Sequence, residues 1–442
     1  MDDIPATPNC QERDSKNNEI SRKNNLELDS EHSVNTTTPD DSAVSPAPEG
    51  GVRAWLVAAG GAAIFFSTLG LSNSFGTFEE YYLSHQLTSE SPSKVSWIGS
   101  LALFLQFSAG VVAGPAFDVF GSKAIHPFAL LYVFSIMMLS LCKSYWHFML
   151  VQGVLMSVCM GMLQIPAFAA VSQYFEKHRA AALGLVVSGS SIGGVVIPTA
   201  LSKMLNDSSL GFGWSLRVIG FVALPLMLFA SVAIKERLPP RKKASWITSD
   251  FRQRQFLVLV ASLFFMFVGM LTPFFYLPSY AVSKGMSPSL AGYLLAIINA
   301  ASTFGRIIPG VLADKYGRFN IFSLGGLSTG VITFCMANVV TQAGFITYSV
   351  FLGFASGSII SGGSAAFSLC QPDSRKLGTT MGIGMALAGI GSLVGPPING
   401  AIVNAYGGYF EVSMFSGAMC LFGGLLALLA KCFTESGILG RT

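Results

Sequence analysis

Apolar residues dominate the chain from residue 54 onward and fall into long runs separated by short polar stretches. The runs cover about twelve segments of 19–27 residues, and an α-helix needs about 20 apolar residues to cross a bilayer. They lie at residues 54–78, 95–114, 124–142, 145–170, 180–203, 214–234, 256–281, 289–312, 320–340, 344–368, 378–404 and 410–432. The pattern therefore predicts an all-α integral membrane protein with twelve transmembrane helices.

A short pattern of glycine and aspartate occurs twice, each time between the second and third apolar run of a group of six. The later copy, residues 310–318, reads GVLADKYGR, and the earlier copy is a degraded version of it. The positions that correspond, at one constant separation, are Gly114 with Gly310, Asp118 with Asp314, and Gly121 with Gly317. Such duplication is typical of secondary transporters. It predicts two six-helix halves, residues 49–234 and 256–432, joined by a basic linker at residues 235–255.

The composition agrees with a membrane protein and excludes an ordinary soluble domain. The chain is 51% hydrophobic and 11% charged, and its mean hydropathy is +0.56, whereas a soluble domain is about 25% charged. Residues 1–48 are polar and acidic with few large apolar side chains, so we expect a disordered tail. Residues 433–442 form a second, short tail.

The distribution of Lys and Arg predicts the orientation. Seventeen basic residues of the predicted loops fall on the side of the N-terminus, and five fall on the other side: Lys94, Lys143, Lys203, Arg217 and Lys284. This positive-inside bias predicts that both termini are cytosolic. We expect a multi-pass protein of the plasma membrane, with a vacuolar or other internal membrane as the alternative. Asn206 is then the usable glycosylation sequon, because it lies on the external side.

The two glycine–aspartate turns have a mechanical interpretation. Glycines such as Gly121 and Gly317 allow a tight reversal at the membrane surface, while an aspartate can cap a helix start or pair with a basic residue such as Arg318. Contacts of this kind can hold one side of a transporter shut. We expect Asp314 to be the more sensitive aspartate, since the turn around Asp118 is degraded.

These turns resemble the loop motif of the major facilitator superfamily, and three further stretches resemble a narrower family within it. Residues 49–55 (EGGVRAW) and 174–184 (YFEKHRAAALG) are similar to the two signatures of the monocarboxylate porters, with departures at His178 and Ala181. Residues 272–281 resemble helix 7 of the fungal members. The resemblance implies the major facilitator fold and solute transport by alternating access.

Ionisable residues are scarce inside the predicted membrane segments. No acidic residue and no histidine falls in the middle of a run, and Arg306 is the charge that lies well inside. A charge at that depth is costly and usually functional. The resemblance implies that Arg306 meets a substrate carboxylate, although Ser302 and Asn73 replace the Asp and Lys of the family. The alternative is that Arg306 snorkels toward the cytosolic surface.

Polar residues near the predicted midplane are candidates for the transport cavity. We predict substrate contacts from Asn73, Tyr276 and Asn299 together with Arg306; for each amide or hydroxyl, an interhelical hydrogen bond is the alternative. Ser74, Gln152 and Gln164 belong to the same wider group. Because the midplane lacks a carboxylate, we expect weak dependence on the proton gradient, with Glu79 or Glu80 as the remaining proton carriers.

The sequence favours a secondary transporter that moves a small organic solute, one that bears a carboxylate. The alternatives are an efflux transporter for a fungal secondary metabolite and a facilitator of a neutral solute. No Walker or HExxH motif occurs, so we expect neither an enzyme nor a cofactor, metal or catalytic residue. The expected partners are the solute and membrane lipid, without nucleic acid. The substrate, direction, coupling ion and oligomeric state stay open.

Overall fold

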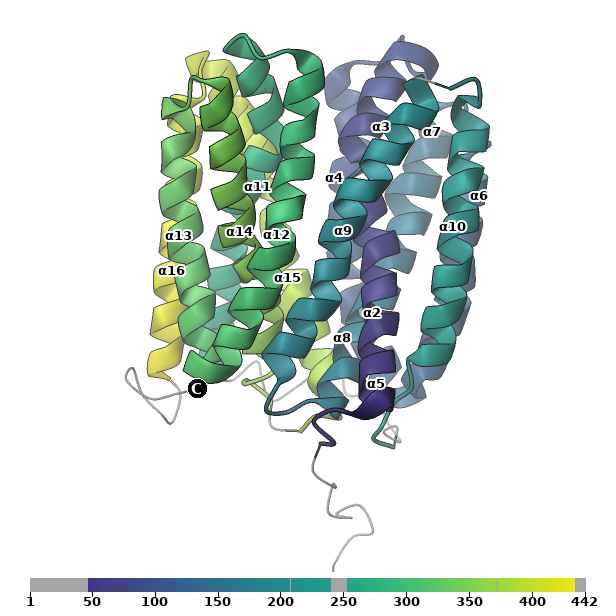
Figure 1. Cartoon of the computed structure of the whole chain (residues 1–442), viewed down its shortest axis with the longest axis vertical. Coiled ribbons are helices and arrows are strands. Elements are labelled where there is room, and N and C mark those ends of the chain that lie inside the picture. Colours follow the sequence, from purple (N-terminus) through teal and green to yellow (C-terminus); the bar gives the residue numbers. More distant parts are fainter. Residues whose placement is uncertain (1–46, 207, 240–252, 372, 434–442) are drawn as a thin grey trace, which may run out of the picture. The chain divides into compact units, whose positions relative to one another are not determined.

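A computed structural model describes residues 47–206, 208–239, 253–371 and 373–433, and within these ranges the regular structure is entirely helical (Figure 1). Most of the predicted N-terminal tail, basic linker and C-terminal tail falls outside the described residues. The predictions for those segments therefore stay predictions.

The first half contains the elements α2 to α10, and several of its membrane crossings are built from more than one helical segment. In chain order these are α2 (Gly51–Ser72), α3 (Phe75–Tyr81), a π-helix (Tyr82–Gln86), α4 (Pro92–Ser108), α5 (Gly110–Phe120), a 3₁₀ turn (Gly121–Ala124), α6 (Ile125–Leu139), α7 (Tyr145–Phe148), a π-helix (Met149–Met156), α8 (Ser157–Tyr174), α9 (Arg179–Asn206) and α10 (Gly211–Ala233).

The second half is more regular. It consists of α11 (Arg254–Ser283), α12 (Pro288–Tyr316), α13 (Arg318–Phe334) with a 3₁₀ turn (Cys335–Asn338), α14 (Gln342–Phe367), α15 (Leu377–Tyr406) and α16 (Phe410–Cys432). Each predicted run of this half matches one of these helices to within a few residues at either end.

Eleven helical stretches of the described chain are long and apolar enough to span a membrane. One of them, Lys94–Leu139, holds 46 residues, which as a single helix would measure about 69 Å, more than twice the thickness of a bilayer core. The chain turns within it at Gly121, where φ is 60°. This stretch therefore supplies two crossings, in agreement with the twelve predicted runs.

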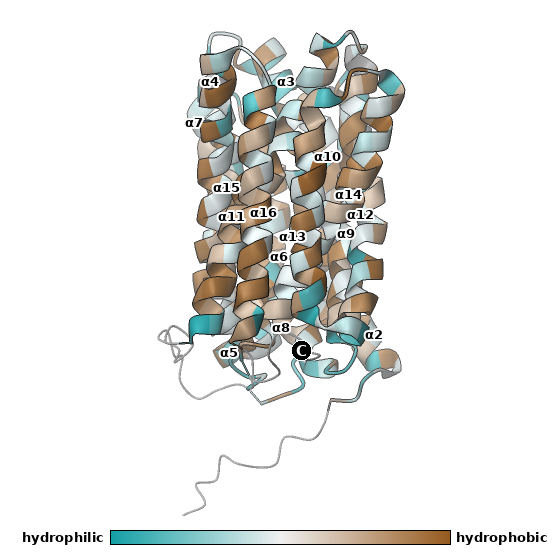
Figure 2. Ribbon diagram, turned by 90° about the vertical axis from the view of Figure 1, so that its left-hand side faces the viewer, coloured by the Kyte–Doolittle hydropathy of each residue, from teal (hydrophilic) through white to brown (hydrophobic). Residues whose placement is uncertain are grey.

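The membrane-spanning helices expose apolar side chains along their length. Figure 2 shows hydrophobic residues along the middle of helices such as α13 and α16 and hydrophilic residues toward their ends. Large apolar side chains such as Leu130, Phe221, Leu324 and Phe351 are between 58% and 62% exposed. A surface of this kind suits lipid rather than water.

Helices of the two halves pack against each other mainly in two places. Helix α9 lies along α12, and α4 and α5 lie along α15; Figure 1 shows α9 and α12 side by side. The start of α2 and the end of α16 lie at the same end of the helices, the lower end in Figure 1. An even number of crossings requires this arrangement.

Candidate gate and transport site

Asp314 caps a helix of the opposite half. It lies near the end of α12, and its two carboxylate oxygens accept the backbone N–H groups of Ala180 and Ala181 at 3.0 and 2.8 Å. These N–H groups belong to the first turn of α9, where a helix leaves donors without internal partners. A carboxylate there is also favoured by the helix dipole. We call this contact the Asp314 cap.

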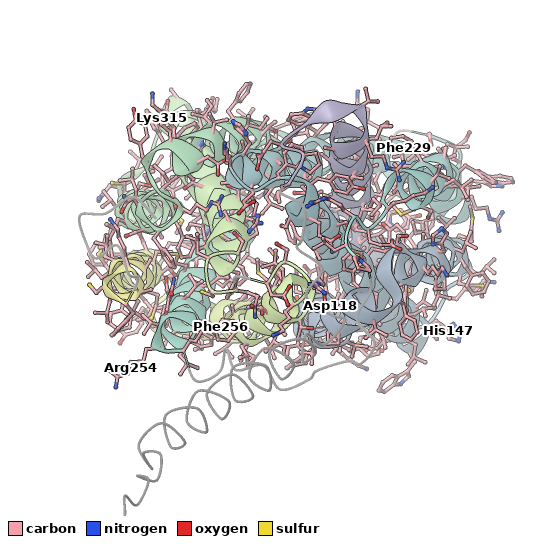
Figure 3. The ribbon with its side chains drawn as sticks, turned by 90° about the horizontal axis from the view of Figure 1, so that it is seen from below. Asp118, His147, Phe229, Arg254, Phe256 and Lys315 are labelled. Atoms are coloured by element: carbon pink, nitrogen blue, oxygen red, sulfur yellow. The ribbon has the colours of Figure 1, made fainter. Side chains whose placement is uncertain are left out.

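Asp118 makes the reciprocal contact in the other direction. It lies in α5, and its Oδ2 accepts the backbone N–H of Thr379 at 3.0 Å as well as the Thr379 hydroxyl. Thr379 belongs to the first turn of α15 in the second half. Viewed from below, Asp118 lies near the middle of the lower face, whereas Arg254 and Lys315 lie at its margin (Figure 3). We call this contact the Asp118 cap.

The two caps are crossed, because each half provides one aspartate and one helix start. The degraded motif around Asp118 thus forms a cap like that of the better-preserved motif around Asp314. Asp314 additionally forms an ion pair with Arg318 at 3.4 Å, and the expectation that Asp314 is the more sensitive aspartate stays a prediction. Both turns use a glycine with positive φ, 60° at Gly121 and 102° at Gly317.

The segment before α2 braces the turn between α8 and α9. Glu49 accepts the backbone N–H groups of Glu176 and Lys177 at 2.7 Å each and that of His178 at 3.2 Å. Burial alone would raise the pKa of the Glu49 carboxyl, but these hydrogen bonds outweigh it, and the pKa lies below its ordinary value. Glu49 also adopts φ 55°, an uncommon conformation for a residue other than glycine.

Arg318 connects the same turn to the second half. Its guanidinium donates to the carbonyl oxygen of Glu176 at 2.7 Å and to the hydroxyl of Ser368 at 3.1 Å, and it lies 3.4 Å from Asp314. The two stretches that resemble monocarboxylate porter signatures, residues 49–55 and 174–184, therefore meet beside the Asp314 cap.

Small residues bring the paired helices into backbone contact above each cap. A Cβ atom at Gly114 would lie 2.2 Å from the carbonyl oxygen of Gly378, and one at Gly184 would lie 2.4 Å from that of Arg306. Such distances are far below van der Waals contact. Glycine is required because any side chain would push the helices of the two halves apart.

Two of the predicted substrate residues meet across the halves. The Nδ2 of Asn73, at the end of α2, lies 3.5 Å from the Oδ1 of Asn299 on α12. A Cβ atom at Gly194 of α9 would lie 2.6 Å from the Asn73 amide. Asn299 is 4% exposed, while Asn73 is exposed. The side chain of Asn73 is thus accessible, and the buried Asn299 contacts its amide from the other half.

Arg306 lies two helical turns below Asn299 and points into protein. It is 5% exposed, and it donates to the carbonyl oxygen of Val187 at 2.9 Å and to the hydroxyl of Ser190, both on α9. Its Nε has no hydrogen-bond partner. The guanidinium is therefore engaged at the interface of α9 and α12 rather than grouped with Asn73.

Tyr276 is also separate from the asparagine pair. Its hydroxyl donates to the carbonyl oxygen of Pro396 at 2.9 Å, which joins α11 to α15 within the second half. Glu79 of α3 is partly buried and accepts a hydrogen bond from the Ser96 hydroxyl within the first half.

The other polar candidates are bonded within the first half. Gln164 bonds to Gln106 at 3.2 Å and to Thr68 at 3.0 Å, and Tyr82 donates to Gln152 at 2.7 Å. These glutamines therefore form interhelical hydrogen bonds, which was the alternative to a contact with substrate.

Asn206 is exposed at the end of α9 opposite the caps, but Asp207 of its sequon lies outside the described residues.

The sequence did not indicate which residues contact Asp118 and Asp314, and it did not indicate that Gln106 donates a hydrogen bond to Gln164. Thr379 follows Gly378 at the start of a predicted helix, a position where hydrogen-bonding side chains are common; that is the one signal available. Nothing in the local sequence pairs it with Asp118. Among the described residues, no three His, Cys, Asp or Glu side chains gather as metal ligands would.

Curated relatives that resemble this chain are fungal transporters. It is 45% identical over 413 residues to the aspyridones efflux protein of Emericella nidulans, covering 92% of this chain and 85% of the relative. It is 36% identical over 437 residues to the agnestins efflux protein of Paecilomyces divaricatus, covering 95% of this chain and 99% of the relative. The relatives are thus efflux transporters rather than specifically monocarboxylate porters.

Solved structures with the same fold are also transporters. The transporter FucP in its outward conformation superposes with a TM-score of 0.65 at 15% identity, covering 86% of this chain and 98% of FucP. The human organic anion transporter MFSD10 superposes with a TM-score of 0.68 at 15% identity, covering 86% and 100%. Residues 60–347 and 310–436 match the Major Facilitator Superfamily. The twelve-crossing fold, the duplicated turns and these matches together establish that the chain belongs to the Major Facilitator Superfamily.

Proposed function

We propose that this protein is an efflux transporter for a fungal secondary metabolite, a small organic molecule that it moves out of the cytosol by alternating access. The observation that carries the proposal is the identity of 45% over 92% of the chain with a relative named for the efflux of such a compound. A second efflux relative is matched over nearly its whole length. The sequence offers this function as an alternative, and we favour it over the main prediction, a transporter of a small carboxylate-bearing solute whose direction is open.

In this proposal the lower end of the helices faces the cytosol, and the crossed caps close it. The positive-inside distribution supports that orientation. When the Asp118 and Asp314 caps form, the two halves are joined at this end and the solute can leave at the other. When the caps break, α9 separates from α12 and α5 from α15, which admits solute from the cytosol. The signatures shared with monocarboxylate porters then serve closure and do not specify the cargo.

The central site recognises hydrogen-bonding groups in this proposal. The amides of Asn73 and Asn299 come from opposite halves, and each offers both donors and an acceptor. A solute carbonyl or hydroxyl held between them would contact both halves at once. Arg306 already donates to Val187 and Ser190, so a solute carboxylate would have to displace protein acceptors to reach it. We therefore favour a solute recognised through neutral polar groups.

Coupling to protons, if present, is assigned to Glu79. Its carboxyl is partly buried in α3 and accepts a hydrogen bond from the hydroxyl of Ser96. We expect weak dependence of efflux on the proton gradient. Steep, protonophore-sensitive efflux that disappears in Glu79→Gln would instead make Glu79 the proton carrier.

The proposal is tested by efflux from cells that express the full-length chain. Cells are preloaded with a panel of small organic metabolites, half of them carboxylic acids and half neutral, and retained compound is measured over time. We expect export of a neutral, carbonyl-bearing member, reduced at least tenfold by Asn299→Ala at equal membrane abundance. Asn320→Ala is the matched control, because Asn320 bonds only to Tyr316 of its own neighbourhood.

Two results would contradict the proposal. Export confined to the acids and abolished by Arg306→Ala would restore the carboxylate reading. Accumulation of panel compounds in expressing cells, with no export of any, would make the protein an importer.

A further inference from the structure

The two amides of the proposed solute site have a fixed orientation, because a backbone carbonyl accepts a hydrogen bond from one of them. The Nδ2 of Asn299 donates to the carbonyl oxygen of Leu295 at 3.0 Å. The Oδ1 of Asn299 therefore faces Asn73, whose Nδ2 donates to it at 3.5 Å. Turning over either amide would bring two acceptor oxygens together, since neither oxygen can donate. The Oδ1 of Asn73 is consequently the atom of this amide that does not face Asn299.

The Oδ1 atom of Asn73 is a free acceptor at the start of this chain of hydrogen bonds. Within the described residues, the contact with Asn299 is the one hydrogen bond of the Asn73 side chain. Asn73 is exposed, although it lies where the end of α2 meets a helix of the other half. An amide oxygen accepts hydrogen bonds and cannot donate them, so a polar group that binds it must be a donor.

A ring of hydrogen bonds holds the last turn of α2, which ends directly before Asn73. The Ser72 hydroxyl donates to the Oε1 of Gln106 on α4 at 3.3 Å, and the Nε2 of Gln106 donates to the Oε1 of Gln164 on α8 at 3.2 Å. The Nε2 of Gln164 donates to the Thr68 hydroxyl at 3.0 Å, which returns the ring to α2. Because both glutamines and Thr68 are buried, water does not compete for these bonds.

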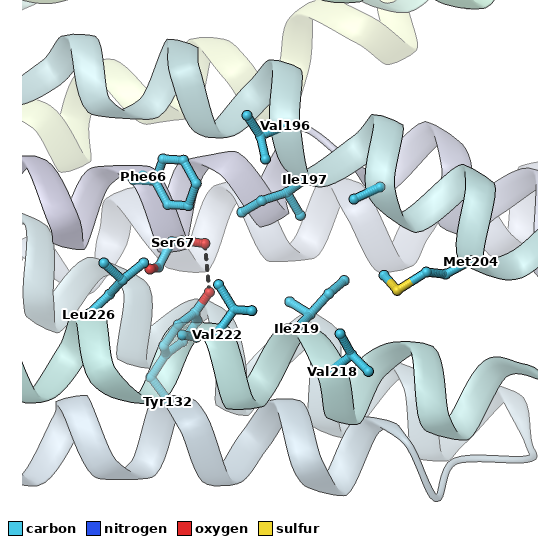
Figure 4. A pocket seen from close by; sticks show the side chains of 12 residues that line it. Phe66, Ser67, Tyr132, Val196, Ile197, Met204, Val218, Ile219, Val222 and Leu226 are labelled. Carbon is cyan, nitrogen blue, oxygen red and sulfur yellow. Dashed lines mark hydrogen bonds between the residues drawn. The ribbon is translucent and has the colours of Figure 1, made fainter. Parts of the chain in front are cut away.

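Helix α6 fixes the same part of α2. The Tyr132 hydroxyl donates to the carbonyl oxygen of Ser67 at 2.8 Å, and both residues line an apolar pocket of the first half (Figure 4). The next residue, Thr68, donates from its hydroxyl to the carbonyl oxygen of Ile64 at 2.7 Å. Hydrogen bonds from α4, α6 and α8 therefore converge on the last two turns of α2.

Helix α9 supports the amide pair with bare backbone. A Cβ atom at Gly194 would lie 2.6 Å from the Nδ2 of Asn73 and 2.9 Å from the Oδ1 of Asn299. A Cβ atom at Gly70 of α2 would lie 2.8 Å from the backbone of Gly193, so α2 and α9 are in contact here. The acceptor of Asn73 is thus held in place before a solute arrives, and such preorganisation lowers the cost of binding.

We propose that the solute donates a hydrogen bond from a hydroxyl or N–H group to the Oδ1 of Asn73, and that the transporter selects solutes that carry such a donor. This selectivity rests on the proposed function, and it specifies the neutral polar group that the central site recognises. The second N–H of Asn73 can donate to a carbonyl oxygen of the same solute. A solute with a hydroxyl beside a carbonyl group therefore uses both ends of this amide.

The test compares neutral, carbonyl-bearing compounds that have a free hydroxyl with their O-methyl ethers, in efflux from cells that express the full-length chain. Methylation keeps the oxygen as an acceptor and removes the donor. We expect the ether to need about a fivefold higher concentration for half-maximal efflux at a similar maximal rate, because one neutral hydrogen bond to an exposed atom is lost. Cells without the protein give the leakage of each compound.

Substitutions assign this preference to Asn73. Asn73→Leu removes the acceptor at similar size and should give the alcohol and the ether equal half-maximal concentrations. Asn320→Leu is the matched control, because Asn320 is exposed and bonds to the carbonyl oxygen of Tyr316; it should keep the preference. Ser72→Ala opens the ring and should weaken the preference, whereas Ser72→Thr keeps the hydroxyl and should retain it.

Purified protein provides a second readout that does not require transport. The alcohol should raise the unfolding temperature more than the ether does at equal concentration, and this difference should vanish in Asn73→Leu. Unfolding temperatures without added compound establish that each variant is folded.

Three results would contradict the proposal. Equal half-maximal concentrations for the alcohol and the ether in the unsubstituted protein would overturn the selectivity and leave the proposed efflux intact. A preference for the alcohol that persists in Asn73→Leu would also overturn it, because the donor would then bind another residue. If no neutral compound leaves the cells faster than it does without the protein, the proposed function fails and the selectivity fails with it.

Discussion

The carboxylates of Asp118 and Asp314 each accept hydrogen bonds from the start of a helix in the opposite half, and Asp314 also forms an ion pair with Arg318 at 3.4 Å. Asp118 accepts two hydrogen bonds from Thr379, and Asp314 accepts the N–H groups of Ala180 and Ala181. Hydrogen bonds to a charged group are each worth about 1.5–3 kcal/mol. Because these bonds join the halves, their free energy favours the conformation in which this end is closed.

We predict that Asp314→Asn and Asp118→Asn each shift the balance between open and closed states about tenfold. The asparagine amide is uncharged and its NH₂ group cannot accept a hydrogen bond from the N–H groups of the opposite helix, and a loss of about 1.4 kcal/mol corresponds to a factor of ten. Transport should fall in both at equal membrane abundance, measured by efflux. Asp373→Asn is the control, because Asp373 bonds within its own loop. If Asp314→Asn reduced efflux and Asp118→Asn did not, the importance of each aspartate would depend on how well its sequence motif is preserved and not on the cap that it forms.

Glu49 gives a prediction with a defined dependence on pH. Its pKa is lowered from an ordinary value of 4.5, so its stabilising contribution is fully present above that value and is lost as the pH falls through the lowered pKa. Glu49→Gln should lower the unfolding temperature of the purified protein near neutral pH. The difference from the unsubstituted protein should shrink below pH 4.5. A difference that is constant across this range would assign the effect to packing instead of charge.

At the scale of helices, closure depends on glycines that let backbones touch. Helices α5 and α15 approach at Gly114 and Gly378, and α9 and α12 approach at Gly184 and Gly310. Each approach lies within one or two turns of a cap. The caps and the close approaches therefore form together, because an aspartate reaches the opposite helix start only when the backbones are in contact.

We expect Gly114→Ala to hold the lower end open, since the added Cβ would lie 2.2 Å from the Gly378 carbonyl oxygen. Thiol labelling of Ser122→Cys, beside the Asp118 cap, reports the opening; the exposed Cys335 and Cys432 are replaced by Ser in the background. Labelling should be faster with Gly114→Ala. Gly292→Ala, which meets nothing within 4 Å, is the control. Equal labelling in the two variants would show that the helices tolerate the methyl group.

The helices could be predicted from hydropathy because membrane insertion requires a minimum apolar length. The predicted run 410–432 coincides with α16, and the run 289–312 lies within α12. The break between α2 and α3 at Asn73 was not predicted, since two polar residues do not interrupt an apolar run. The crossed caps were also invisible, because Asp118 and Thr379 are far apart in the chain. Arg306 was recognised as a charge in the membrane, but its acceptors on α9 depend on how the halves pack.

At the scale of the whole molecule, the duplicated sequence becomes a reciprocal arrangement. The first half contributes Asp118 and the start of α9, and the second contributes Asp314 and the start of α15. The Asn73 and Asn299 contact lies between the same halves, above both caps. The proposed solute site and the caps therefore share one interface between the halves. Membership of the Major Facilitator Superfamily agrees with this arrangement, and the relatives direct attention to efflux.

The crossed caps also bear on how the protein is assembled. Each half carries a docking aspartate and a receiving helix start, so recognition between the halves does not require them to share a chain. Residues 1–239 and 253–442, produced as two polypeptides in one cell, should find each other in the membrane and restore efflux. Asp118→Asn in one fragment combined with Asp314→Asn in the other should abolish this complementation, while either change alone should only weaken it. A transporter built in this way is, in effect, a heterodimer whose subunits are covalently tied.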